Sequence, residues 1–272
     1  MDLQEFAALH LPALELDEVR FNVQIAVLKA AAAEPPAGFA FWSLGAPGHC
    51  ATRSPGRPIL LGNLDKAQCC KLAKATVDLD YPGVVGADET AIWFAEHAAA
   101  LGIGFQEPIP QRISLLDCAP RHPNAPGRPR DLTAEDAPLL HEWMTAFHRE
   151  AVPHDPPPRK DLVEKAAVSG RFLFWIVDGE PVSVAAISRR LRHTTAIAPV
   201  YTPPAHRSRG YGGSVTAAVV ERAFAEGRPV ACLFTDLRNP MSNRCYAKIG
   251  FTPYCDAWHF VRVHGPENVA AN

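Results

Sequence analysis

VYTPPAHRSRGYGG, at residues 200–213, is the most informative stretch of this 272-residue chain. It runs from a predicted strand at 194–202, through a turn, into a predicted helix at 211–226. Glycines at such a turn leave backbone N–H groups free to face an anion, and the helix N-terminus adds partial positive charge. Arg207 and Arg209 can add charge-assisted contacts to a phosphate. The stretch thus predicts an anion-binding turn, and a glycine-rich turn with solvated arginines is the alternative.

The chain on both sides of this turn alternates strand and helix signals. Apolar runs at 172–177 and 181–188 flank Asp178-Gly179, which is a hairpin turn signal. The remaining signals of the second half are a helix at 131–150, a strand at 230–235, a helix opened by Asn239-Pro240 and ended by Gly250, and a β-like segment at 251–263. A right-handed crossover is the natural connection between the strands on either side of the 211–226 helix. The second half is therefore predicted to be a mixed α/β domain.

A second pattern, NPMSNRCYAKIGF at residues 239–251, follows one helix and one strand after the turn. In this order, the two patterns resemble the R/Q-x-x-G-x-G/A turn and the N-x-x-A/S-x-x-x-Y-x-x-x-G-F helix of the GNAT superfamily of acyl-CoA-dependent N-acyltransferases. The resemblance covers about residues 127–263. A dinucleotide-binding fold would instead need G-x-G-x-x-G after the first strand, and that spacing is not present.

The resemblance implies a mixed α/β GNAT fold, with a mostly antiparallel central sheet and one splayed strand pair. The first half has a similar order of signals: a helix at 22–33, strands at 39–44 and 57–64, a helix at 87–101 and a strand at 111–117. Together the two halves resemble bacterial tandem GNAT proteins. No R-x-x-G-x-G turn occurs in residues 1–125. We therefore expect a degenerate copy that has lost coenzyme A and shapes the acceptor pocket or an interface; an independent accessory fold is the alternative.

Prolines indicate where the halves divide. The segment RHPNAPGRPR at 121–130 is polar, proline-rich and contains glycine, as is typical of a linker. We therefore expect a degenerate or accessory domain at 1–125 and a catalytic domain that binds acetyl-CoA at 126–272. A second proline-rich run, VPHDPPPR at 152–159, predicts a surface loop between helices.

In GNAT proteins the turn binds the pyrophosphate of coenzyme A, and the splayed strand beside it binds the pantetheine. The resemblance implies that the backbone at 200–202 bonds the pantetheine amides and that the amides of 209–213, with Ser214, bind the pyrophosphate. Asn239 and Asn243 fall on one face of the second helix and could contact the pantetheine arm or the phosphates. Tyr246 falls on the same face a turn later, where its hydroxyl would lie near the departing thiolate. The full set implied for acetyl-CoA is Val200, Tyr201, Thr202, Arg207, Ser208, Arg209, Gly210, Tyr211, Gly212, Gly213, Ser214, Asn239, Ser242, Asn243 and Tyr246.

Acyl transfer to an amine needs a polarised thioester carbonyl and a proton for the departing sulfur. A strand N–H can stabilise the oxyanion. Tyrosine is protonated at neutral pH, so Tyr246 could protonate the thiolate, and we predict it as the general acid; a packing role is the alternative. Asp236, at the end of a strand, is a weak candidate for a general base, and His193 is a second candidate whose alternative is a solvated side chain; we assign no base.

The predicted function is therefore an N-acetyltransferase that moves an acetyl group from acetyl-CoA to a small-molecule amine by direct attack in a ternary complex. The alternatives are a non-catalytic coenzyme A sensor or scaffold and a protein N-acetyltransferase. The sequence leaves the acceptor, the length of the acyl group and the choice between monomer and homodimer open.

Composition argues against several other classes of protein: nucleic-acid-binding, membrane, secreted and metal-binding proteins. The chain has 27 basic and 29 acidic residues and a formal net charge of −2, so no overall basic field favours nucleic acid or an anionic membrane. No apolar run reaches the ~20 residues of a membrane-spanning helix, and the acidic N-terminus is unlike a signal peptide, so we expect a cytoplasmic protein. The seven cysteines contain no C-x-x-C pair and the eleven histidines no H-E-x-x-H, so we expect no metal.

Overall fold

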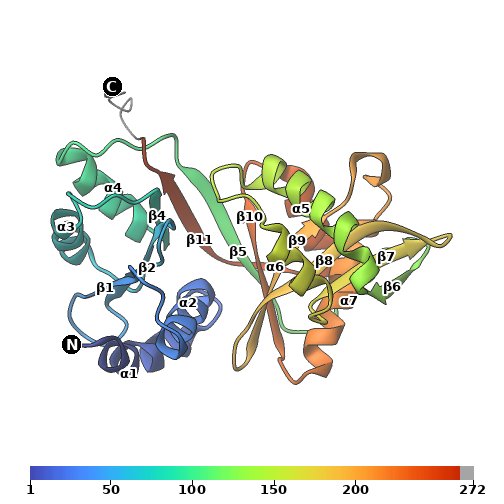
Figure 1. Cartoon of the computed structure of the whole chain (residues 1–272), viewed down its shortest axis with the longest axis horizontal. Coiled ribbons are helices and arrows are strands. Elements are labelled where there is room, and N and C mark those ends of the chain that lie inside the picture. Colours follow the sequence, from blue (N-terminus) through green and yellow to red (C-terminus); the bar gives the residue numbers. More distant parts are fainter. Residues whose placement is uncertain (264–272) are drawn as a thin grey trace. The chain divides into compact units, whose positions relative to one another are not determined.

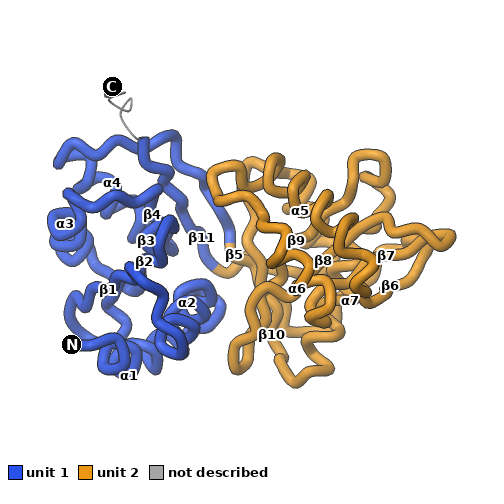
Figure 2. The backbone as a smooth tube through the Cα atoms, in the orientation of Figure 1, with its two compact units in different colours: residues 1–112, 255–272 blue, residues 113–254 orange. Residues whose placement is uncertain are grey.

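The computed structural model describes residues 1–263, which form two compact units (Figure 1; Figure 2). Unit 1 comprises Met1–Arg112 and the chain from Cys255 onward, and unit 2 comprises Ile113–Tyr254. Two strands, β5 (Ile109–Leu116) and β11 (Thr252–Val261), cross the boundaries between the units.

Unit 2 is a mixed α/β unit with the strand order β5-β10-β9-β8-β7-β6. Its other elements are β6 (Arg128–Asp131), α5 (Ala137–Ala151), α6 (Lys160–Ala167), β7 (Phe172–Val177), β8 (Glu180–Arg190), β9 (Thr194–Tyr201), α7 (Tyr211–Ala225), β10 (Val230–Asp236) and α8 (Pro240–Ile249). The pairs β6–β7, β7–β8 and β8–β9 are antiparallel, whereas β9 and β10, which α7 connects, are parallel. The predicted fold class, with a mostly antiparallel sheet, is therefore confirmed.

The parallel pair β9–β10 separates along its length. Its registered pairs run from Thr194↔Val230 to Ala196↔Cys232, although both strands continue beyond these residues. The later part of β9 stays paired with β8 on its other side, as far as Val184↔Tyr201. One edge of β9 therefore loses its strand partner over its last residues, as the predicted splayed strand requires.

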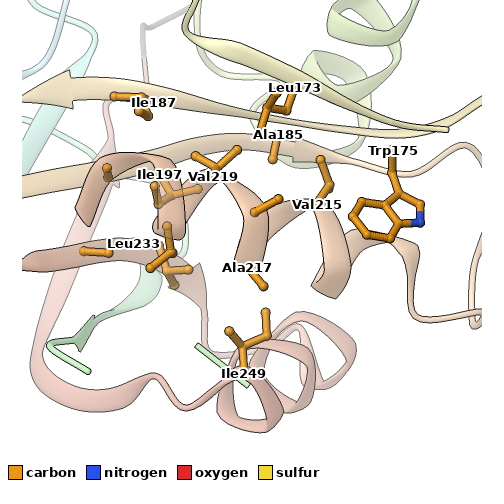
Figure 3. Packing of buried hydrophobic residues seen from close by; sticks show 14 of the residues in the cluster. Leu173, Trp175, Ala185, Ile187, Ile197, Val215, Ala217, Val219, Leu233 and Ile249 are labelled. Atoms are coloured by element: carbon orange, nitrogen blue, oxygen red, sulfur yellow. The ribbon is translucent and has the colours of Figure 1, made fainter. Parts of the chain in front are cut away.

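A buried hydrophobic cluster fixes α7 between the sheet and α8 (Figure 3). Val215 and Val219 of α7 are at most 1% exposed and pack in one cluster with Ile187 and Ile197 of the strands. On another face of α7, Ala217 points toward Ile249 of α8 (Figure 3). Because apolar side chains on two faces of α7 are buried, the position of its N-terminus is fixed by the core.

Unit 1 contains a smaller sheet with the strand order β1-β2-β3-β4-β11. Its elements are α1 (Leu3–Leu14), α2 (Asn22–Ala33), β1 (Ala40–Ser43), β2 (Cys50–Arg53), β3 (Ile59–Leu61), α3 (Lys66–Ala75), β4 (Gly83–Ala87) and α4 (Thr90–Ala100). The strands β3 and β4 are parallel and α3 connects them, whereas the pairs β1–β2, β2–β3 and β4–β11 are antiparallel. The segment β3-α3-β4 thus has the same strand-helix-strand connection as β9-α7-β10 of unit 2.

The proline-rich segment at 121–130 is packed into unit 2 instead of forming a free linker. The Arg121 N–H donates to the Ile249 carbonyl (2.8 Å), and the Trp175 indole N–H donates to the Pro126 carbonyl (2.8 Å). The end of the segment starts β6, which pairs with β7. The compact units accordingly divide after residues 112 and 254, where the sequence suggested a single division after 125.

The last strand also departs from the sequence-based division. The segment 251–263 was expected to close the second half, but β11 pairs antiparallel with β4 of unit 1, from Ala257↔Ala87 to Val261↔Gly83. A Cβ atom at Gly83 would overlap the carbonyl oxygen of Phe260, so glycine permits the close approach of these strands. Unit 1 therefore takes its final strand from the end of the described chain.

A buried histidine ties α1 to the edge of this sheet. His10 is fully buried, its Nδ1 accepts the Gly48 backbone N–H (3.1 Å), and its Nε2 lies 2.9 Å from the Ser43 hydroxyl. Since Nδ1 is an acceptor, the ring proton of the neutral imidazole is on Nε2. Burial, and after it the nearby His49, lowers the pKa of His10 below its ordinary value of 6.5.

We expect this histidine to make the protein less stable in acid. Because the folded-state pKa lies below the unfolded value, the stabilisation is fully present above pH 6.5 and is lost as the pH falls through the folded pKa, by at most about 1.4 kcal/mol per pH unit. Urea unfolding at several pH values would measure this slope, and His10→Gln should flatten it. An identical slope in the variant would contradict the assignment, and His154, whose pKa is also lowered, would be tested next.

Within residues 1–263, none of the helices has both the length and the apolar character that crossing a membrane requires.

Candidate active site

The turn before α7 has the backbone geometry of an anion-binding loop. Ser208 and Gly210 have positive φ values of 62° and 84°, and Gly210 immediately precedes the helix. The Ser214 N–H makes the first helical bond, to the Gly210 carbonyl (3.0 Å). The amides of Tyr211, Gly212 and Gly213 are therefore the N-terminal donors that the helix itself cannot use, and the helix dipole adds positive charge there.

The two glycines at the start of α7 have different surroundings. A Cβ at Gly213 would lie 2.8 Å from Pro123 Cγ and 3.5 Å from Cys245 Sγ, so this glycine allows the connecting segment and α8 to pack against α7. A Cβ at Gly212 would meet only the Thr202 hydroxyl, at 3.1 Å. Gly213 thus has a packing role, whereas Gly212 keeps the backbone open beside the end of β9.

Arg207 bridges this turn to the end of β9 and to α5. Its Nε donates to the Thr202 carbonyl (2.9 Å), and its Nη2 forms an ion pair with the Glu150 carboxylate (2.6 Å). The Tyr201 hydroxyl also donates to Glu150 (3.3 Å), and the guanidinium lies 5.8 Å from the Tyr201 ring centroid. Burial, followed by the Glu150 charge, raises the pKa of Tyr201. A cation predicted to bind phosphate is therefore paired with an internal carboxylate.

The other turn residues divide into exposed and buried side chains. Ser208 and Arg209 are exposed at the turn. Ser214 is 1% exposed, and its buried hydroxyl has no hydrogen-bond partner in the described structure. On the neighbouring strand, the Thr202 hydroxyl lies 2.8 Å from the hydroxyl of Ser183, which also donates to the Tyr201 carbonyl (3.0 Å).

The asparagines of α8 hold that helix in place. The Asn239 side chain caps the helix by accepting the Ser242 N–H (3.2 Å). The Asn243 amide donates to the carbonyls of Asp236 (3.2 Å) and Leu237 (3.3 Å), which ties α8 to the end of β10. These contacts give both asparagines a structural role, and the contacts to coenzyme A implied for them and for Ser242 remain predictions.

Tyr246 lies on α8 between the core and the surface. Its ring packs edge-on against Phe251, with the ring centroids 6.0 Å apart, and borders the core cluster of unit 2. Among the described residues its hydroxyl has no hydrogen-bond partner. Burial, and after it Cys245, raises the pKa of the phenol above its ordinary value of 10. The raised pKa keeps the phenol protonated at neutral pH and also makes it a weaker acid than a free tyrosine, and its role as general acid remains a prediction.

Asp236 is poorly suited to act as a general base. Although burial raises its pKa, the hydrogen bonds and charge of Arg238, which pairs with it at 3.0 Å, hold the pKa below its ordinary value of 3.8. His193 lies in the turn between β8 and β9, where its carbonyl accepts the Val230 N–H (3.2 Å). The geometry therefore gives no reason to assign a base.

The corresponding turn of unit 1 has the opposite electrostatic character. The helix α3 is capped by Asp65, whose carboxylate accepts the Gln68 N–H (2.8 Å). The preceding Gly62 faces the carbonyls of Gly48 and Cys50, because a Cβ there would lie within 2.8 Å of both oxygens. A resident carboxylate already occupies the N-terminus of α3 and would repel a phosphate.

Sequence reasoning missed the residues that reach the site from distant parts of the chain. Glu150 is 57 residues before Arg207, Ser183 is 19 residues before Thr202, and Pro123 comes from the expected linker. A carboxylate at the end of a helix and a serine in a strand have no distinctive local pattern. Only the tertiary fold brings them to the turn.

Comparison with known proteins assigns the class. The sequence profile of the acetyltransferase (GNAT) family matches residues 137–251, which include the splayed strand, the glycine turn and α8. Residues 137–251, which lie in unit 2, therefore form a domain of the GNAT acetyltransferase family.

Solved structures share the fold over both units. A GCN5-related N-acetyltransferase from Kribbella flavida has a TM-score of 0.60 at 18% identity, covering 90% of this chain and 95% of that one. A Drosophila protein has a TM-score of 0.64 at 14% identity, and the match covers 95% of this chain and 94% of that one. A tandem GNAT protein from the clavulanic acid biosynthesis pathway has a TM-score of 0.53 at 14% identity, and the match covers 89% of this chain and 88% of that one. A search of the curated proteins found no match.

Proposed function

We propose that the protein is an N-acetyltransferase that moves the acetyl group of acetyl-CoA to the amine of a small molecule. The observation that carries the proposal is the separation of β9 from β10 beside a turn with three N-terminal helix donors. An extended backbone edge suits the amides of a pantetheine arm, and helix donors suit a pyrophosphate. We also propose, from the sequence, that the protein is cytoplasmic.

Each part of the coenzyme has residues in unit 2 that fit it. The backbone of Val200, Tyr201 and Thr202 would bond the pantetheine, although the side chains of Ser183 and Arg207 already donate to the last two carbonyls. The amides at 211–213 would bind the pyrophosphate. The lack of a side chain at Gly212, where a Cβ would lie 3.1 Å from the Thr202 hydroxyl, lets the phosphate approach these amides closely.

The chemical step needs little covalent participation by the protein. The acceptor nitrogen attacks the thioester carbon, the carbon–sulfur bond breaks, and the sulfur takes the proton of Tyr246. The attacking amine loses its proton through water, and that proton restores the phenol of Tyr246, so that the products are the acetylated amine and free coenzyme A. A β9 amide would stabilise the oxyanion, but Pro199 has no N–H, so the donor must be another residue of the unpaired edge.

A thiol-release assay tests the proposal. Purified protein with acetyl-CoA and a panel of small amines, amino acids and polyamines should release free thiol in proportion to acetylated product for at least one acceptor. Propionyl-CoA in place of acetyl-CoA would test the acyl group. Peptides with free N-termini or lysines form the second panel. Calorimetric binding of coenzyme A without turnover on either panel would favour a sensor, and no binding would overturn the proposal.

The Glu150–Arg207 ion pair leads to a specific prediction. Because Glu150 competes with the coenzyme for the same guanidinium, Glu150→Gln should tighten coenzyme A binding about two- to fivefold, the size expected for a half-exposed pair. Arg207 should stay oriented through Thr202 and Tyr201. Calorimetry would measure the effect, and Glu142→Gln on the same helix is the matched control. Weaker binding in Glu150→Gln would mean that Glu150 positions Arg207 instead of competing for it.

A further inference from the structure

Unit 1 has a concavity of its own, to which no role has been assigned above. A concavity of about 460 Å³ opens between α1, β1 and α3, and its lining includes Phe6, Phe41, Trp42 and Leu44. The Phe6 and Phe41 rings are in contact, with centroids 4.7 Å apart. This volume is within the range of small-molecule sites, and the aromatic lining suits a flat apolar body.

The lining of this concavity contains two polar side chains, Ser43 and Lys71, and each can donate a hydrogen bond. Ser43 lines it, and the Ser43 oxygen accepts the Nε2 proton of buried His10, because Nδ1 of that ring is occupied by the Gly48 N–H. The hydroxyl proton of Ser43 is therefore left to donate elsewhere. The buried histidine thus fixes the serine as a donor.

Lys71 of α3 has the one charged side chain of the lining, which also includes Met1, whose N-terminal ammonium lies 4.0 Å from the Glu5 carboxylate. In the described part of the chain the Lys71 ammonium forms no ion pair, and no acidic side chain lines the concavity with it. An ammonium has only donors to offer. The polar end of a fitting ligand must therefore accept hydrogen bonds, and a negative charge on that end would add an attraction to the ammonium.

We infer that unit 1 binds a small aromatic carboxylate at this concavity. The ring packs against the partly exposed Phe41 and Trp42, which rest on the buried Phe6, and the carboxylate accepts hydrogen bonds from Lys71 and Ser43. This gives the first unit a ligand of its own, chemically unlike the coenzyme proposed for unit 2. The inference does not depend on that proposal, because the residues that carry it all belong to unit 1.

Titration of the full chain with phenylpropionate, without coenzyme A, tests the inference. We expect saturable binding by calorimetry together with a change in tryptophan fluorescence that Trp42→Phe removes. The corresponding amide, phenylpropionamide, should bind about tenfold more weakly, because it lacks the charge that pairs with the ammonium. Cyclohexylpropionate tests whether the ring must be flat.

Variants on α3 separate the site from general effects on the helix. Lys71→Gln should weaken phenylpropionate binding about tenfold, and Ser43→Ala should weaken it by a smaller factor. Lys74→Gln, an exposed lysine of the same helix outside the lining, should leave it unchanged. Equal affinity for acid and amide, an equal loss in both lysine variants, or no saturation up to about 5 mM would each overturn the inference.

Discussion

Replacing Tyr246 with phenylalanine should lower kcat by about 10²–10⁴-fold, the usual contribution of a general acid, while coenzyme A affinity changes little. The hydroxyl is expected to act mainly when sulfur departs, and the ring contact with Phe251 is retained in the variant. Steady-state kinetics on the acceptor found by the thiol-release assay, with calorimetry on the same protein, would measure both quantities.

The raised pKa of Tyr246 adds a pH test to this substitution. Because burial holds the pKa above 10, the phenol stays protonated throughout the neutral range, and kcat should show no alkaline decline from this group below pH 10. Tyr254→Phe, a more exposed tyrosine of the same unit, is the control and should keep its kcat. Loss of rate and affinity together would mean that Tyr246 positions the coenzyme, and an unchanged kcat would leave it a packing role.

Gly212→Val should weaken coenzyme A binding about 10- to 100-fold. A valine side chain beside Thr202 would hold the pyrophosphate away from the amides at 211–213, and each charge-assisted hydrogen bond to the backbone contributes about 1.5–3 kcal/mol. Gly212→Ala should give a smaller loss, because its single methyl group reaches less far. Calorimetry with coenzyme A measures both variants.

The same titration gives the number of sites per chain. We expect one, because Asp65 occupies the helix terminus of unit 1 that corresponds to the turn at Gly212. Gly104→Val is the control for the substitution, since Gly104 lies in unit 1 and a side chain there meets only ordinary contacts. Two equivalent sites would contradict the view that unit 1 has lost coenzyme A. Unchanged affinity in a folded Gly212→Val protein would contradict the site itself.

The second half of the fold was predictable because its elements have strong local signals. The run FLFWIV matches β7 over Phe172–Val177, and α8 begins after Asn239 and ends at Gly250, which has a φ of 116°. In unit 1, only α2 was predicted with its observed bounds. The missed β2, at Cys50–Arg53, is four residues long, and the missed α1 contains Pro12, so neither has a clear period. Short strands and interrupted helices depend on tertiary contacts that a local pattern does not contain.

The candidate site was predictable to the same extent. The turn at 207–213 is a local feature, so its left-handed glycine and helix start follow from the sequence. The partner of Arg207 does not, because Glu150 comes from another helix and meets it only after folding. The compact units divide at residues other than 125 for a related reason: prolines typical of a linker also suit a segment that packs against a helix terminus, as Pro123 does beside Gly213.

The shared use of β11 has a consequence for how the chain is made and dissected. During synthesis β4 leaves the ribosome long before β11. The sheet of unit 1 therefore stays incomplete until almost all of unit 2 has been translated. Until then β4 is an edge strand, and an unpaired edge invites association with other chains. A gene fragment that ends at residue 125 would make this exposure permanent. Expressed alone, it should aggregate, and supplying a peptide with the β11 sequence should restore its solubility.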